Sequence, residues 1–362
     1  MANHQLKKKV KWHLKNYKML NPKLKLNPKI FNSDPEGKQA SYGAGVEQVA
    51  IRKGFGDGLL LAGEADKNVV ALCADLTEST QMNLFAEKFP KRFIEMGVAE
   101  QNLVTVSSGM AAMGKIPFCS SYAMFSPGRN WEQIRTTIAY NDKPVKIVGS
   151  HAGISVGADG GTHQALEDIA LMRVIPNMDV ISPCDAIEAK KATLALAKTG
   201  KPAYLRLARE KTPILTTEET PFEFGKAQIY WVPDVGIAQV GIIVTGSLTY
   251  RAMLAAKELE SKGIKTKVMN LSSVVPIDVE AIVTLAKESK AIVTVEEHQI
   301  KGGMGSAVAE VLAQNYPVPI EFVGVQNSFG QSGTPDELIK HYEMDVPDIV
   351  LAVEKVLKRK LT

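Results

Sequence analysis

The sequence predicts an α/β protein of two consecutive domains, each a mostly parallel sheet flanked by helices. From about residue 42 to the end, short β-rich segments alternate with helical ones, which is the pattern of a parallel α/β sheet. A polar, proline-containing stretch interrupts this alternation once. The length of 362 residues is more than one ordinary hydrophobic core holds. We therefore expect two cores.

The expected boundaries follow from composition. We assign residues 1–40 to a basic leader and connector, 41–212 to the first domain, 213–235 to a linker and 236–362 to a second, smaller domain. The strands expected in the first domain are 69–74, 116–122, 145–150, 179–183 and 203–208. Those expected in the second domain are 241–246, 265–271, 291–297 and 320–325. Each is a short apolar or β-branched run between helical segments.

The leader concentrates the positive charge of the chain. Residues 1–38 hold ten Lys against Asp34 and Glu36, although the whole chain carries a net charge of only +4. Its first half has the spacing of a short basic amphipathic helix. We expect this helix to pack on its own chain or on a partner subunit, rather than on nucleic acid or an anionic membrane. It has no secretory apolar segment, and the chain has no run long enough to span a membrane. With three scattered cysteines, this predicts a cytoplasmic protein.

The tripeptide Gly-Asp-Gly at residues 56–58, followed by Asn83, has the spelling and spacing of a motif that binds magnesium and a diphosphate. Such a motif should leave a buried strand and enter a helix. Here the surrounding apolar residues instead recur at helical spacing, so the tripeptide should lie inside a helix. We interpret its glycines as points of close approach to another backbone.

The densest group of polar residues lies in the segment 150–177, which begins where a predicted strand ends. His151, Asp159 and His163 all lie there, in a glycine-rich loop. Such a loop at the carboxyl edge of a sheet is a common ligand site. Metal binding and hydrogen bonding to sugar or phosphate groups are both open interpretations. Two histidines and an aspartate so close together favour function over a purely structural loop.

Three other groups are candidates for chemistry. Glu100 enters a small, apolar helical segment, where partial desolvation favours its neutral form and suits it to share a proton with a ring nitrogen. A helix-terminal glutamate stabilised by the helix dipole is the alternative. Tyr122 and Phe125 follow a strand and could stack on a flat heterocycle or pack in the core. The arginines that could bind a phosphate are Arg52, Arg206 and Arg209.

Four segments in this order resemble the carboxyl-terminal half of transketolase. They are GVAEQN (97–102), HAGISVGADGGTHQALED (151–168), IPNMDVISPCDA (175–186) and VEEHQIKGGMGSAVAE (295–310). The resemblance runs from about residue 40 to the end and implies a pyrimidine-binding domain followed by the family's C-terminal domain. Gln101 and Asn102 depart from many transketolases and resemble deoxyxylulose-phosphate synthases, whereas His151 before Ala-Gly favours transketolase.

The resemblance implies a role for each candidate residue. Glu100 matches the glutamate that hydrogen-bonds N1′ of the aminopyrimidine of thiamine diphosphate and so promotes loss of the thiazolium C2 proton. The residues implied to bind the cofactor are Asp75, Glu100, Tyr122 and Phe125. Those implied to bind substrate are Arg52, Ser79, His151, Asp159, His163 and Arg209. Within this set, the residues that match the phosphate-binding positions of the family are Arg52, Ser79, His151 and Arg209. The implied catalytic residues are Glu100, His151 and His163.

A whole transketolase begins with a diphosphate-binding domain, whereas only the leader precedes the pyrimidine-binding domain here. We therefore expect a subunit of a split transketolase that moves a two-carbon ketol unit from a ketose phosphate to an aldose phosphate. A diphosphate-binding partner subunit should supply the Mg²⁺ ligands, and this chain should form a homodimer within a heterotetramer. The alternatives are a subunit of a deoxyxylulose-phosphate synthase-like or 2-oxo acid dehydrogenase enzyme, or a non-catalytic scaffold.

Overall fold

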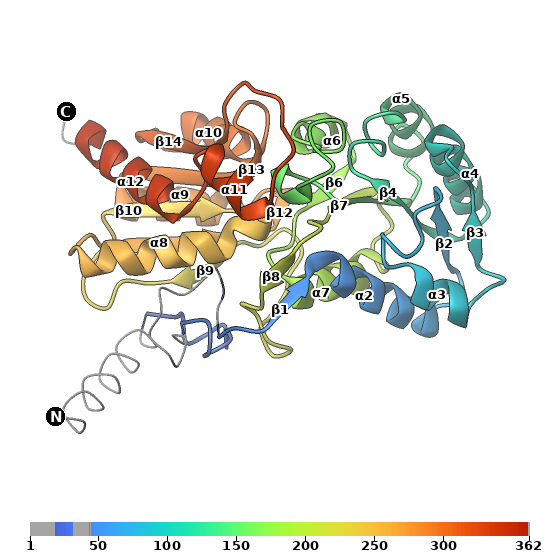
Figure 1. Cartoon of the computed structure of the whole chain (residues 1–362), viewed down its shortest axis with the longest axis horizontal. Coiled ribbons are helices and arrows are strands. Elements are labelled where there is room, and N and C mark those ends of the chain that lie inside the picture. The colour runs from blue at the N-terminus through green and yellow to red at the C-terminus, as the bar shows by residue number, and fades with distance from the viewer. Residues whose placement is uncertain (1–18, 32–42, 44, 361–362) are drawn as a thin grey trace.

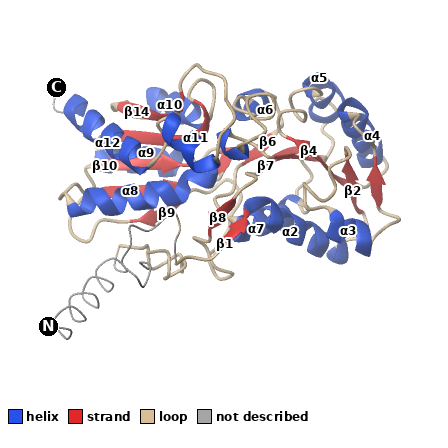
Figure 2. Cartoon of the chain, viewed as in Figure 1, coloured by secondary structure: helices blue, strands red, loops and turns tan. Residues whose placement is uncertain are grey.

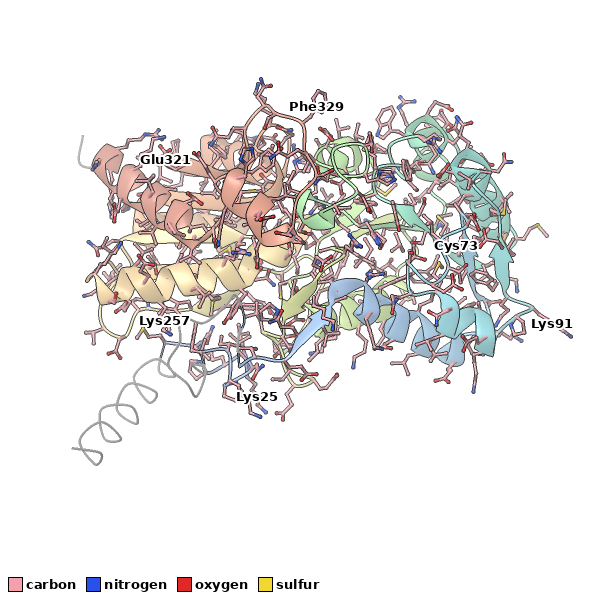
Figure 3. The ribbon with its side chains drawn as sticks, viewed as in Figure 1. Lys25, Cys73, Lys91, Lys257, Glu321 and Phe329 are labelled. Carbon is pink, nitrogen blue, oxygen red and sulfur yellow. The ribbon has the colours of Figure 1, made fainter. Side chains whose placement is uncertain are left out.

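The computed structural model describes residues 19–31, 43 and 45–360. The amphipathic helix predicted in the leader falls outside these residues (Figure 1). Within them, no helix is long and apolar enough to cross a membrane. All three cysteines are free and buried, and Figure 3 shows Cys73 inside the first domain.

The first domain is built on a seven-stranded sheet with the strand order β12-β6-β7-β5-β4-β2-β3. Its strands are β2 (Val69–Cys73), β3 (Phe93–Glu95), β4 (Ile116–Tyr122), β5 (Lys146–Ser150), β6 (Asp179–Ile181), β7 (Ala203–Arg206) and β12 (Ser273–Val275). All neighbours are parallel except β12 and β6. Its helical elements are α2 (Ile51–Ala65), α3 (Asn83–Lys88), α4 (Glu100–Ala112), α5 (Trp131–Gln133), the π-helix η1 (Ile134–Ala139), the 3₁₀ helix η2 (Ile154–Val156), α6 (Asp168–Arg173) and α7 (Ala186–Leu196). A separate antiparallel pair joins β1 (Gln48–Ala50) to β8 (Lys211–Pro213).

The second domain has a five-stranded sheet with the order β14-β13-β10-β11-β9. Its strands are β9 (Gln228–Trp231), β10 (Val240–Val244), β11 (Thr266–Asn270), β13 (Ile292–Gln299) and β14 (Ile320–Val325). Only β9 runs antiparallel to its neighbour. The helical elements are the 3₁₀ helix η3 (Gly246–Leu248), α8 (Thr249–Ser261), α9 (Val279–Ser289), α10 (Met304–Asn315), α11 (Pro335–His341) and α12 (Val346–Lys360). The predicted fold class is confirmed.

Helices cover both faces of the first sheet, which explains why its central strands are apolar throughout. Because side chains alternate along a strand, Val69, Ala71 and Cys73 of β2 pack in the cluster formed by α2 and α7. Val70 and Leu72 pack in the cluster that contains α4 and α6. Figure 2 shows these two pairs of helices on opposite sides of the sheet.

All nine predicted strands are present, but β3, β9, β12 and the β1–β8 pair were not predicted. These strands have only three or four residues, too few to show a period of two. Strands β6 and β7 are as short, but each lies within a longer β-rich run, 179–183 and 203–208. Strand β9 lies inside the segment predicted as a linker and joins the sheet of the second domain.

Helix α2 contains the Gly-Asp-Gly tripeptide, as predicted, and its glycines are packing points. A Cβ atom on Gly54 would lie 1.8 Å from the carbonyl oxygen of Ala186 at the start of α7. One on Gly56 would lie 2.4 Å from the carbonyl oxygen of Gln81. Asp57 pairs with Lys53 on the surface of the same helix. The tripeptide therefore brings α2 against its neighbours and does not form a loop at a strand end.

The two domains are joined through a shared sheet edge and a buried ion pair. Strand β12, from the second half of the chain, pairs with β6 of the first sheet. Nε of Arg206 lies 2.8 Å from Oδ2 of Asp168, and its Nη2 donates to the carbonyl of Glu297 in β13 at 2.8 Å. Both side chains of the pair are almost fully buried. One arginine thus connects β7, the start of α6 and the second domain.

Replacing Gly54 by alanine should destabilise the chain by about 3 kcal/mol, because the added methyl group has to push α2 away from α7. The free energy of unfolding from a urea titration measures this loss. Gly109→Ala is the matched control: it lies in α4 with open space around its Cβ position, so it should stabilise the chain by up to about 1 kcal/mol. Equal effects of the two substitutions would show that the α2–α7 contact is not tight.

Candidate active site

The residues predicted for the site gather where parallel strands end. Asp75 and Ser79 follow β2, Tyr122 ends β4, His151 follows β5 and Arg209 follows β7. These four strands are consecutive neighbours in the first sheet. Their carboxyl ends therefore meet at one edge, the usual position of a ligand crevice in such a fold.

Glu100 lies beside this edge as the first residue of α4 and is only 2% exposed. Its Oε2 accepts a hydrogen bond from Nη1 of Arg129 at 2.8 Å, and its backbone carbonyl accepts one from Nδ2 of Asn130 at 2.9 Å. The helix dipole also favours a carboxylate at this end of α4. The sequence left two alternative settings for Glu100, a buried position and a helix N-terminus. The structure shows that Glu100 has both.

Aromatic rings connect Glu100 to the histidines. The guanidinium of Arg129 lies 5.1 Å from the ring centre of Phe125, and the Phe125 and Tyr122 rings are stacked with centres 6.2 Å apart. His151 stacks on Tyr122 at 3.9 Å, and His163 meets the Phe125 ring edge-on at 5.3 Å. These rings form an aromatic wall that could hold a flat heterocycle.

The imidazole of His151 is held neutral by its surroundings. Burial, together with the positive charges of Arg52 and Arg209, lowers the pKa of His151 to about 3. Its Nδ1 lies 2.9 Å from the hydroxyl oxygen of Ser150. His151 has a left-handed backbone (φ +57°), which is uncommon for a residue other than glycine. A neutral ring has one donor and one acceptor nitrogen, so His151 can hydrogen-bond a carbonyl or hydroxyl group.

Arg52 and Arg209 form a positive cluster next to His151. Nε of Arg52 donates to the backbone carbonyl of Arg209 at 3.1 Å, and its Nη1 donates to the carbonyl of Ser79. Burial and the nearby Arg209 lower the pKa of Arg52. The carboxylate of Glu210 approaches Nε of Arg209 only to 3.7 Å. Two guanidinium groups with so little neutralising charge suit an anionic ligand.

Three other sequence candidates do not join this group. Asp75 and Asp159 are exposed, and within the described part of the chain neither side chain contacts another candidate residue. The interpretation of Arg206 as a phosphate ligand is wrong, because both its Nε and its Nη2 are committed to Asp168 and to backbone carbonyls in the interior. The sequence could not show this, because its partners come from two segments far from it in the chain.

Residues 47–214 match the family model for the transketolase pyrimidine binding domain, and residues 230–349 match the model for the transketolase C-terminal domain. The chain is 42% identical to a putative transketolase C-terminal section from Methanocaldococcus jannaschii, covering 86% of this chain and 97% of that one. The chain belongs to the transketolase family. It is also 38% identical to the 6-deoxy-6-sulfo-D-fructose transketolase subunit SqwH of a Clostridium species, over 87% of this chain and 97% of that one. A split gene transketolase solved as an inactive β4 tetramer matches with a TM-score of 0.80 and 42% identity, covering 86% of this chain and 99% of that one.

This chain therefore has the two domains that form one half of longer transketolases. Human transketolase is 33% identical over 88% of this chain, which corresponds to 51% of the human protein. The resemblance found in the sequence is confirmed. The Gly-Asp-Gly of α2 thus lies in the pyrimidine-binding domain of a transketolase.

Four residues of this transketolase site were not predicted. Arg129 and Asn130 hold Glu100, and their only sequence signal was their place after Phe125 in the segment SPGRN. Gln164 donates to the carbonyls of Ile154 and Gln331 at 3.0 Å. It thereby joins the loop 151–168, which contains His151 and His163 and is called the histidine loop below, to the second domain. Glu297 accepts a hydrogen bond from the amide of Ser155 in the same loop. Contacts between segments so far apart leave no local pattern.

The donor set fits the aminopyrimidine end of thiamine diphosphate. A buried carboxyl group lies next to an aromatic wall, and both lie at the carboxyl edge of the sheet. In the ranges that the structure describes, no group of three or more His, Cys, Asp or Glu side chains is arranged to hold a metal ion.

The imidazole of His151 should not titrate between pH 8 and pH 5, because burial and two arginines lower its pKa to about 3. NMR of ¹³C-labelled histidine measures this, with the signal assigned by its loss in His151→Asn. Arg209→Met should raise the pKa of His151, whereas Arg135→Met, at an exposed position on η1, should not. A wild-type midpoint near pH 6.5, the ordinary value, would contradict the burial and charge described above.

Proposed function

We propose that this chain is the pyrimidine-binding and C-terminal subunit of a split transketolase, which moves a two-carbon ketol unit from a ketose phosphate to an aldose phosphate. One observation carries the proposal. A single site places a buried carboxyl group, Glu100, at one end and two guanidinium groups, Arg52 and Arg209, at the other, joined by Tyr122 and His151. This arrangement suits a ligand that has a ring nitrogen at one end of the site and an anionic sugar at the other.

Each site residue of this chain has a separate role in the proposed reaction. Glu100 shares a proton with N1′ of the aminopyrimidine, and Tyr122 and Phe125 pack against the ring, with Asp75 nearby. When bound, thiamine diphosphate supplies the stabilisation of negative charge that allows the C2–C3 bond of a ketose to be broken and remade. His151, His163 and Asp159 hydrogen-bond the carbonyl and hydroxyl groups of the sugar. Because His151 is neutral, it adds no charge to the residues that bind the phosphate.

Arg52, Arg209, Ser79 and His151 bind the phosphate of the sugar in this proposal. Arginine suits this task because its planar donors match the phosphate oxygens. Two relatives are named for anionic sugars: SqwH for a sulfofructose, and a transketolase subunit from Phocaeicola vulgatus, 36% identical, for apulose-4-phosphate. In these substrates the anionic group lies several bonds from the carbonyl carbon, whereas the carboxylate of a 2-oxo acid is bonded directly to it. Two arginines at the end of the site away from Glu100 therefore favour the transketolase reaction over that of a dehydrogenase subunit.

The diphosphate and its Mg²⁺ would be held by a partner subunit. The Gly-Asp-Gly of this chain is packed inside α2 and does not form a phosphate loop. The exposed face of α4, which follows Glu100, carries Val106 (40% exposed), and Met113 just beyond the helix is 83% exposed. Apolar side chains there suit a protein interface. We propose a heterotetramer in which two copies of this chain pair with two diphosphate-binding subunits in the cytoplasm, where free cysteines such as those of this chain persist.

Glu100→Gln should lower the turnover of the assembled enzyme at least about 100-fold, because proton transfer by a positioned acid is worth that much or more. The assay mixes this chain with its diphosphate-binding partner and follows ketose phosphate consumption. Glu87→Gln, at an exposed glutamate of α3, is the control and should leave turnover unchanged. Unchanged turnover in Glu100→Gln would sink the assignment, and consumption of pyruvate instead of the ketose phosphate would favour a dehydrogenase.

Arg52→Met should raise the KM for a phosphorylated aldose about 10- to 100-fold, since a hydrogen bond to a charged group is worth about 1.5–3 kcal/mol. The KM for glycolaldehyde, which has no phosphate, serves as the control within the same enzyme and should change little. If the two KM values rose together, Arg52 would support the fold and not the phosphate.

A further inference from the structure

Arg209 is fixed through one nitrogen of its guanidinium group. Its Nη1 donates to the backbone carbonyl of Val156 at 2.5 Å, whereas the carboxylate of Glu210 approaches its Nε only to 3.7 Å. Within the part of the chain that the structure describes, Nη2 of Arg209 has no hydrogen-bond partner. The contact with Val156 therefore sets where the guanidinium lies and leaves Nη2 for a ligand.

Val156 ends η2, a turn of the histidine loop that packs against the second domain. The side chain of Ile154, which begins η2, is buried in the same hydrophobic cluster as Ile339 of α11. Gln164 joins the carbonyl of Ile154 to that of Gln331. The second domain thus contributes both packing and hydrogen bonds that position η2.

Glu297 of β13 anchors the middle of η2 by its carboxylate. This side chain is 2% exposed, its Oε1 accepts a hydrogen bond from the amide of Ser155 at 2.5 Å, and its Oε2 accepts one from the hydroxyl of Ser247. Hydrogen bonds to a charged acceptor are stronger than those between neutral groups. Gly153 has a φ of +90°, and a Cβ atom there would lie 2.4 Å from Oε1 of Glu297. The backbone of the histidine loop therefore passes very close to this carboxylate.

A cavity next to this contact gives η2 room to move. Its volume is about 370 Å³, and the polar side chains that line it include Ser155, Ser247, Glu297 and Glu210. A segment packed tightly on every side is held in place by its neighbours. On the side of the cavity, in contrast, η2 can shift once its hydrogen bond to Glu297 is lost.

We propose that Glu297 is a positioning residue, which acts through η2 to hold Arg209 where the phosphate of the sugar binds. The inference rests on the proposed function. Glu297 holds the amide of Ser155, and the carbonyl of Val156, the next residue, holds Arg209. In this way the second domain takes part in the recognition of phosphorylated substrates without touching them.

Arg52 does not depend on this path. Its Nε and Nη1 donate to the backbone carbonyls of Arg209 and Ser79, which belong to the first domain. Loss of the Glu297 contact should therefore displace the guanidinium of Arg209 and leave that of Arg52 in place. The effect on phosphate binding should be no larger than that of removing the Arg209 guanidinium itself.

Steady-state kinetics of the complex with the diphosphate-binding subunit tests the inference. The KM is measured for a phosphorylated aldose and for glycolaldehyde, with the ketose phosphate donor at saturating concentration. Glu297→Ala removes the anchor, Glu297→Asp withdraws it by one methylene group, and Glu297→Gln keeps an oxygen that can accept from Ser155. Glu296→Asp is the matched control, because the carboxylate of this neighbouring buried residue accepts from the amides of Met304 and Gly305 in α10 instead.

Glu297→Ala and Glu297→Asp should raise the KM for the phosphorylated aldose about 5- to 10-fold, since misplacing a binding group by about 1 Å can cost up to about 100-fold. The KM for glycolaldehyde should stay unchanged, and Glu297→Gln and Glu296→Asp should resemble wild type. If Glu297→Ala does not fold, Glu297→Asp decides the question. In the Arg209→Met enzyme, a substitution at Glu297 should raise the KM no further, because residues that act through one contact are not additive.

Three results would overturn this inference alone. They are an unchanged KM for the phosphorylated aldose in Glu297→Asp, an equal rise in both KM values, and a further rise when Glu297→Asp is added to Arg209→Met. A wild-type complex that does not consume the ketose phosphate overturns the proposed function itself.

Discussion

The buried ion pair between Arg206 and Asp168 is the interaction on which the site depends most. Burial alone would raise the pKa of Asp168, but Arg206 and the hydroxyl of Tyr204 outweigh it and lower that pKa. The same arginine binds the carbonyl of Glu297 in the second domain. Breaking such a pair by removing one partner typically costs about 3–5 kcal/mol. The histidine loop, which ends at Asp168, is therefore anchored to both domains, and Gln164 and Glu297 hold its middle.

With that loop fixed, charge is distributed along the site in a definite order. A buried acid lies at the start of α4, stacked rings follow, then a neutral imidazole, and finally two arginines. Charges of one sign therefore do not crowd together except at the arginine cluster, where repulsion contributes to the lowered pKa of Arg52. An anionic ligand at that cluster would relieve the repulsion. The repulsion between Arg52 and Arg209 thus lowers the stability of the protein until an anionic ligand binds beside them.

Much of this was readable from the sequence, and the remainder depends on tertiary contacts. The nine predicted strands, the helix around residues 56–58 and the entry of Glu100 into α4 follow from apolar patterns in the local sequence. Strands β9 and β12 are too short to show such a pattern. The sequence did not single out Arg129, and it suggested Arg206 as a phosphate ligand, because their partners lie 29 and 38 residues away in the chain. The roles given to Asp75 and Asp159 rest on family resemblance alone, since neither touches the rest of the site.

We propose that this chain holds the pyrimidine end of thiamine diphosphate and that a partner subunit holds the other end. Calorimetry of thiamine diphosphate and Mg²⁺, first with this chain alone and then after adding the diphosphate-binding subunit, tests it most directly. We predict no saturable Mg²⁺-dependent binding by the chain alone and one bound cofactor per copy of this chain in the complex. Tight, Mg²⁺-dependent binding by the chain without its partner would contradict the claim.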